Sequence, residues 1–87
     1  MSDIIKDAIE KYGTENQLVV AIEELSELQK ELTKYLRGNG NLEHIAEEMA
    51  DVKIVYAQLE EIFRNRGKVF DYEIQKIERL RQRINEE

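Results

Sequence analysis

Two pairs of carboxylates in this chain have the spacing by which a helix points two side chains the same way. Glu24 and Glu27 form the first pair, and Glu48 and Asp51 form the second. Residues three apart are neighbours on a helix surface. Carboxylate oxygens are the ligands of hard cations such as Mg²⁺, which is commonly shared between carboxylates and substrate phosphates. We therefore expect these four residues to bind Mg²⁺, or Mn²⁺ in its place.

The elements that must position these acids are two long helices, expected at about 15–37 and 42–66. Between them, Gly38 suits the left-handed position after a helix, and Asn41 suits an N-cap. Thr14 to Gln17 has the form of a capping box at the start of the first long helix. Shorter helices are expected at 3–12, ended by Gly13, and at 71–85, after Gly67 has closed the second long helix.

Each long helix carries an apolar stripe at helical spacing, with its acids on one shoulder of the stripe. The stripes consist of Leu18, Ile22, Leu25, Leu32 and Leu36 in the first helix and of Ile45, Met49, Val52, Tyr56, Leu59 and Phe63 in the second. The short connection predicts that the helices pair antiparallel through these stripes, which makes the acid pairs face each other. The like charges of facing carboxylates repel one another, which favours a cation bound between them.

A plainer interpretation of the acids is a solvated helix surface. The chain contains 15 Glu in 87 residues, so a string such as Glu23-Glu24-x-x-Glu27 can arise by chance. What favours a metal site is the combination of two i,i+3 acid pairs, on two facing helices, beside the apolar stripes. His44 has no Cys or second His near it and is interpreted as a surface residue.

The composition limits the class of protein. A chain of 87 residues, with no Pro and 37% charged residues, predicts one all-α domain over 1–87. Without Cys there are no disulfides, thiolate metal ligands or thiol nucleophiles. No segment has the apolar length of a membrane span or the form of a signal peptide, so we expect a cytoplasmic protein that binds no membrane. The net charge of -6 argues against stable nucleic-acid binding.

Basic residues gather near the end of the chain. Lys76, Arg79 and Arg83 fall on one side of the expected fourth helix. This row is either a solvated surface or a group that binds phosphate.

The long helices have more apolar surface than one partner can cover, which predicts a homodimer or homotetramer packed as a helical bundle. Beside the main stripes lie Ala46, Ala50, Ala57, Val55 and Ile62 in the second long helix, and Ala21, Leu28 and Tyr35 in the first. A domain this small has little other surface to cover them. A closed two-fold dimer is the commonest arrangement.

The acidic motif resembles that of the MazG-like nucleoside triphosphate pyrophosphohydrolases, in the all-α NTP pyrophosphatase superfamily that also holds the dimeric dUTPases. The resembling residues are Glu23-Glu24-x-x-Glu27, then 20 residues, then Glu48-x-x-Asp51. The resemblance extends over nearly the whole chain, which corresponds to a minimal single-domain form. It implies that Glu24, Glu27, Glu48 and Asp51 are the catalytic Mg²⁺ ligands, and that Lys76 and Arg79, with Arg83 beside them, contact the substrate phosphates.

The function implied is Mg²⁺-dependent hydrolysis of a ribo- or deoxyribonucleoside triphosphate. Water attacks the α phosphorus, pyrophosphate leaves and the nucleoside monophosphate remains, as in enzymes that clean or control nucleotide pools. The alternative is a non-catalytic helical assembly or regulatory module with a vestigial acidic site. The base, the sugar, the number of ions and the general base are left open by the sequence.

Overall fold

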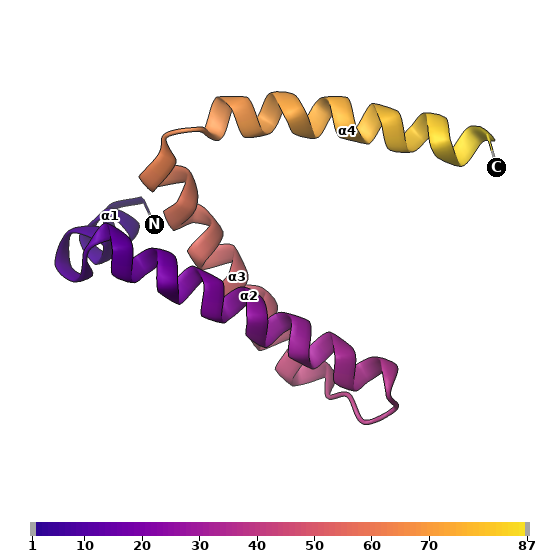
Figure 1. The fold of residues 1–87 in the computed structure, drawn as a ribbon, viewed down its shortest axis with the longest axis horizontal. Coiled ribbons are helices and arrows are strands. Elements are labelled where there is room, and N and C mark those ends of the chain that lie inside the picture. The colour runs from indigo at the N-terminus through magenta and orange to yellow at the C-terminus, as the bar shows by residue number, and fades with distance from the viewer. Residues whose placement is uncertain (1, 87) are drawn as a thin grey trace.

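The computed structural model describes residues 2–86, and in that range it is all-helical, with four helices and no strand. This confirms the predicted all-α class. The helices are α1 (Ser2–Tyr12), α2 (Thr14–Leu36), α3 (Leu42–Phe63) and α4 (Arg66–Glu86), as Figure 1 shows. The first three pack against one another, whereas α4 extends away from them. No helix within residues 2–86 combines the length and apolarity that crossing a membrane requires.

Three of the predicted breaks are confirmed. Gly13 and Gly38 both have φ of 90°, a left-handed conformation in which Gly avoids the strain that a side chain brings. The Asn41 side chain accepts hydrogen bonds from the backbone N–H groups of Glu43, at 2.9 Å, and His44, at 3.1 Å. It therefore caps α3 as expected.

The capping box predicted at Thr14 to Gln17 is wrong. Thr14 is already helical, and the N-cap is Gly13, which makes no side-chain cap bond. The Gln17 side chain accepts instead a hydrogen bond of 2.7 Å from Gln58 Nε2 on α3. Gln17 therefore makes a tertiary contact, although the local sequence pattern assigned its side chain to the start of α2.

The boundary between the last two helices also differs from the prediction. α3 ends at Phe63, and Arg64 takes the left-handed position with φ of 50°. Asn65 then accepts from the backbone N–H of Val69 at 2.9 Å, so the next helix begins before Gly67, which lies in its first turn. As a result α4 has 21 residues against 22 in α3, and the prediction of a shorter C-terminal helix over 71–85 is wrong.

The faces through which α2 and α3 pack are not the predicted stripes. Within the chain, Ala21 and Val55 are 2% and 4% exposed, whereas Ile22 and Leu36 of the α2 stripe are 67% and 85% exposed. On α3, Met49 is likewise exposed. The helices meet through a narrower face built around small Ala21, which turns the acidic shoulder of each helix towards the other. The predicted pairing through the full stripes is therefore wrong: each stripe keeps exposed members such as Ile22, Leu36 and Met49 beside half-buried ones.

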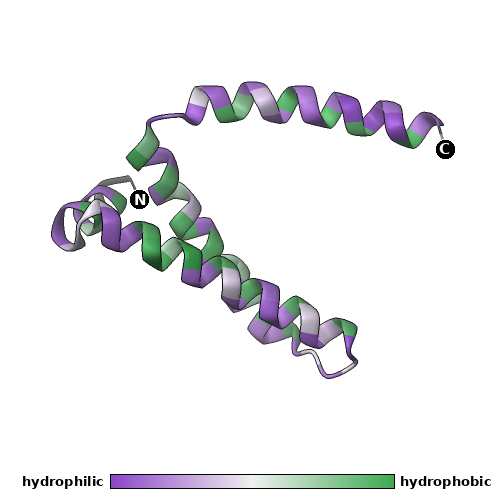
Figure 2. Cartoon of the chain, viewed as in Figure 1, coloured by the Kyte–Doolittle hydropathy of each residue, from purple (hydrophilic) through white to green (hydrophobic). Residues whose placement is uncertain are grey.

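The single chain is open in shape. Its radius of gyration is 16.0 Å, whereas a compact chain of this length has about 12 Å. Its accessible surface is 7349 Å², against about 5,400 Å² for a compact monomer of this mass. Every residue in 70–86 is exposed, and hydrophobic and hydrophilic positions alternate along α4 in Figure 2. Much apolar surface on α2, α3 and α4 therefore has no cover within the chain.

Candidate metal centre

Three of the four predicted ligands come together between α2 and α3. Glu24, on α2, lies opposite Glu48 and Asp51, which are one turn apart on α3, and a carboxylate oxygen of each lies within 4.8 Å of the others. Glu24 and Glu48 are half-buried and Asp51 is exposed. The i,i+3 spacing on α3 and the packing of the acidic shoulder of α2 therefore produce a cluster of oxygen donors from two helices.

The fourth predicted ligand, Glu27, is not part of this cluster. Its side chain is exposed, because a step of three residues from Glu24 carries it towards the outer side of α2. Its charge nevertheless acts on the cluster, since it raises the pKa of both Glu24 and Glu48. Glu27 thus lies near enough to influence the centre electrostatically, without contributing an oxygen to it in this conformation.

The pKa values of two cluster members are displaced in the direction that crowded carboxylates give. Partial burial raises the pKa of Glu24, and the charge of Asp51, hydrogen bonding with Asp51 and the charges of Glu48 and Glu27 add to the rise. Partial burial also raises the pKa of Glu48, followed by the charges of Asp51, Glu27, Glu31 and Glu47. Both carboxylates are therefore less easily ionised in the folded chain than in the unfolded one.

The donor set suits a hard divalent cation. Glu24, Glu48 and Asp51 offer only carboxylate oxygens, which are the ligands that Mg²⁺ and Mn²⁺ prefer over softer nitrogen and sulfur donors. Three ligands from a half-open site leave room for waters and substrate oxygens, as Mg²⁺ requires. The residues therefore fit the predicted ion.

We expect Mg²⁺ or Mn²⁺ to raise the melting temperature of the protein. An ion that binds the folded carboxylates and not the unfolded chain stabilises by mass action and also relieves their repulsion. The measurement is thermal unfolding followed by circular dichroism in EDTA and in millimolar MgCl₂. KCl of equal ionic strength is the control for general screening. Equal melting curves in EDTA and MgCl₂ would count against the centre.

The size of this metal effect should depend on pH. Because the folded pKa values of Glu24 and Glu48 lie above the unfolded ones, the folded state binds more protons in the window between them. The cluster's contribution to stability therefore falls as pH rises through that window. The same melting experiment should give a larger Mg²⁺ increment at about pH 8 than at about pH 5, because protons compete with the ion for the carboxylates as pH falls. An increment that grows on acidification contradicts this.

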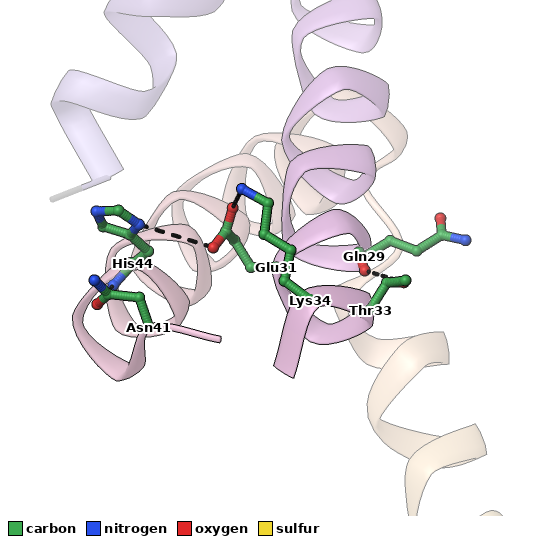
Figure 3. A network of polar contacts seen from close by, with 6 residues as sticks. All are labelled: Gln29, Glu31, Thr33, Lys34, Asn41 and His44. Atoms are coloured by element: carbon green, nitrogen blue, oxygen red, sulfur yellow. Dashed lines mark hydrogen bonds and ion pairs between the residues drawn. The ribbon is translucent and has the colours of Figure 1, made fainter. Parts of the chain in front are cut away.

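A second polar group lies next to the cluster, where the ends of α2 and α3 meet. Glu31 is 7% exposed, and its Oε2 pairs with Lys34 Nζ at 3.3 Å. Its Oε1 lies 3.9 Å from His44 Nδ1 and has no hydrogen-bond partner among the described residues. Figure 3 shows Glu31 between Lys34 and His44, with the N-cap Asn41 close by. Lys34 thus compensates part of the charge of a buried acid that in turn acts on Glu48.

The basic row of α4 is separate from the carboxylates within one chain. Lys76, Arg79 and Arg83 are all exposed, and α4 leads away from the α2 and α3 pair in Figure 1. The ion pair between Arg66 and Glu60, at 3.8 Å, joins only the first turn of α4 to α3. The role of this row in phosphate binding remains a prediction.

Sequence reasoning did not select Glu31, Gln17 or Gln58 as site residues. A signal was present for the first two: Gln17, Glu24 and Glu31 are seven residues apart in turn and so lie on one side of α2. The same interval relates Asp51 to Gln58 on α3. Gln17 was interpreted as part of a capping box, and the apolar stripe was taken as the packing face.

Comparisons with protein-family models, with curated proteins and with solved structures found no match for this chain. The function proposed below rests on the arrangement of its own residues and on the resemblance of its acidic motif.

Proposed function

We propose that this protein is a Mg²⁺-dependent nucleoside triphosphate pyrophosphohydrolase. The observation that carries the proposal is the cluster of Glu24, Glu48 and Asp51, whose carboxylate oxygens lie within 4.8 Å of one another across two helices. A purely solvated acidic surface gains nothing from such crowding, since like charges at this distance raise each other's pKa. A cation bound by these carboxylates and in contact with substrate phosphates would account for their close spacing.

In the proposed reaction, Glu24, Glu48 and Asp51 hold the ion between α2 and α3. When bound, the ion supplies positive charge to the triphosphate oxygens and lowers the pKa of a water. Half-burial of Glu24 and Glu48 limits the motion of their carboxylates, while the carboxylate of Asp51 is exposed and so open to an incoming substrate. A bond forms between the water oxygen and the α phosphorus, the bond from the α phosphorus to the bridging oxygen of pyrophosphate breaks, and the proton of the water is released to solvent.

The working form is proposed to be a homodimer or a homotetramer. The single chain exposes about 2,000 Å² more surface than a compact monomer of its mass, and obligate interfaces bury about 1,000 to 2,500 Å² on each partner. The exposed members of the α2 and α3 stripes supply apolar surface for this interface. Charge favours it too, because α4 has six Lys and Arg against four Asp and Glu, whereas α3 has six Asp and Glu against one Lys.

The test is a panel of ribo- and deoxyribonucleoside triphosphates assayed for released pyrophosphate. We expect pyrophosphate and the monophosphate in equal amounts with Mg²⁺, and neither product in EDTA. No release from any member of the panel would remove the proposal.

The basic row of α4 is proposed to bind the phosphates, so Arg79→Ala should weaken substrate binding. A guanidinium acts on phosphate oxygens and not on the metal, and losing one charge-assisted contact raises KM by roughly tenfold to a hundredfold. The Mg²⁺ increment in melting temperature should persist.

Arg81→Ala is the matched control for this variant. Arg81 carries the same side chain on another side of α4 and pairs with Glu78 at 3.2 Å. If Arg79→Ala and Arg81→Ala both retain the wild-type KM and kcat, the row is solvated surface only.

A further inference from the structure

Polar side chains meet in three successive pairs along the contact between α2 and α3. The pairs are Gln17 with Gln58, Glu24 with Asp51, and Glu31 with His44. The members on each helix are seven residues apart, so they lie on one side of that helix. The first pair is a hydrogen bond and the second belongs to the carboxylate cluster, whereas the third has no role in the proposed reaction.

The third pair consists of a buried carboxylate and an exposed imidazole. The side chain of Glu31 is 9% exposed and that of His44 is 58% exposed. Glu31 Oε1, which has no hydrogen-bond partner among the described residues, lies 3.9 Å from His44 Nδ1. Because a buried oxygen without a donor costs stability, a small rotation of the ring that lets Nδ1–H donate to it is favourable. Glu31 therefore favours the neutral histidine tautomer whose proton is on Nδ1.

Two further contacts hold this pair in place. Lys34 Nζ donates to Glu31 Oε2 at 3.3 Å, which leaves Oε1 for the imidazole. The backbone N–H of His44 donates to the Asn41 side chain at 3.1 Å, so the N-cap of α3 fixes the position from which the ring extends. Figure 3 shows the carboxylate of Glu31 between Lys34 and His44.

The other ring nitrogen of His44 is left as a proton acceptor. With the proton on Nδ1, the lone pair of the neutral ring is on Nε2, which points away from Glu31 in Figure 3. His44 precedes Glu48 by four residues, so the two side chains are neighbours on α3, with Cβ atoms about 5–6 Å apart. A carboxylate that binds Nδ1–H and leaves Nε2 to take a proton is the arrangement of a histidine general base.

We propose that His44 Nε2 accepts the proton of the attacking water, with Glu31 as its positioning residue. The inference rests on the proposed function, because that function places the water beside Glu48. As the water oxygen bonds to the α phosphorus, one O–H bond of the water breaks and an N–H bond forms at Nε2. The carboxylate of Glu31 stabilises the resulting imidazolium. The exposed ring then releases this proton to solvent, which restores its neutral form.

The position of the proton on His44 is the first test, and it needs neither metal nor substrate. His44 is the only histidine in the chain, so its ring signals are unambiguous. In ¹⁵N-labelled wild-type protein at alkaline pH, long-range ¹H–¹⁵N spectra should place the proton on Nδ1. Glu31→Gln should lose this preference, because a carboxamide can donate to Nδ1 as well as accept from it. Glu43→Gln, which removes an exposed acid next to His44 in the sequence, should keep it.

The second test is hydrolysis by His44→Ala, which keeps the Asn41 cap because that contact uses the backbone. We expect kcat to fall at least about a hundredfold, as for loss of a general base. The Mg²⁺ increment in melting temperature should stay at the wild-type value, because the imidazole is not one of the proposed ligands. Added imidazole should restore part of the lost rate, since the exposed position lets it enter and accept the proton. A purely structural role of His44 gives no such rescue.

The outcomes separate the role of His44 from the proposed function. A wild-type proton mainly on Nε2, the same tautomer preference in Glu31→Gln, an unchanged kcat in His44→Ala, or a loss that imidazole does not restore would overturn the inference alone. A wild-type protein that releases no pyrophosphate would overturn both.

Discussion

We expect Glu48→Gln to remove most of the proposed pyrophosphohydrolase activity and to leave the helices intact. Glutamine keeps the shape of the side chain but deletes the charge of a half-buried ligand in the cluster. We expect kcat to fall by at least about a hundredfold, as for loss of a group that stabilises charge in the transition state. The measurement is steady-state release of pyrophosphate, together with circular dichroism.

The stability of this variant provides a second prediction from the same change. Because burial and the neighbouring acids raise the pKa of Glu48, removing its charge relieves repulsion in the metal-free protein. The melting temperature in EDTA should therefore equal or exceed that of the wild type, and the Mg²⁺ increment should shrink. Glu43→Gln is the matched control, since Glu43 is an exposed acid in the first turn of the same helix. Near-normal turnover in Glu48→Gln would exclude Glu48 from the site.

The second large effect concerns assembly. At micromolar concentration the wild-type chain should sediment as a dimer or tetramer of its 10.3 kDa mass. Ile22→Glu places a charge in the uncovered stripe of α2, where Ile22 is 67% exposed in the single chain. In a monomer this change is nearly neutral, but in a packed interface it buries an unpaired charge. The dissociation constant should then rise by at least about tenfold.

Sedimentation equilibrium of the wild type and of Ile22→Glu distinguishes a monomer from an assembly packed through this stripe. Asn16→Glu is the control, because Asn16 is exposed on another side of α2. A folded and active single-chain species in the wild type, or identical association of the wild type and Ile22→Glu, would contradict the proposed interface.

Local signals in the sequence predicted the helix breaks because their physics is local. Gly13, Gly38 and Asn41 act through the backbone of their own turns, and each takes its expected role. Two other boundaries depend on distant or less typical choices. Gln17 bonds to a residue 41 positions away, and Arg64 takes a left-handed conformation three residues before Gly67, which was expected to close the helix. Neither choice is encoded in the neighbouring residue types.

Periodicity predicted which sides of the long helices are apolar but not which sides meet. A stripe containing Ile22 and Leu36 needs cover, yet the pattern does not say whether the cover comes from the same chain or another. In this chain the Ala21 side packs inside, and the stripe is left open. The cluster of Glu24, Glu48 and Asp51 was still predictable, because these acids lie beside either choice of face. The sequence could not show that Glu27 lies outside the cluster, since i,i+3 spacing gives proximity along a helix and not orientation towards a partner helix.

Hydrolysis in ¹⁸O-labelled water tests the proposed function most directly. Wild-type protein, Mg²⁺ and a nucleoside triphosphate from the panel are combined, and the products are separated and weighed by mass spectrometry. Attack at the α phosphorus predicts one ¹⁸O in the nucleoside monophosphate, none in pyrophosphate, and no reaction in EDTA. Label in pyrophosphate, release of orthophosphate with a diphosphate remaining, or turnover that persists without metal would contradict it.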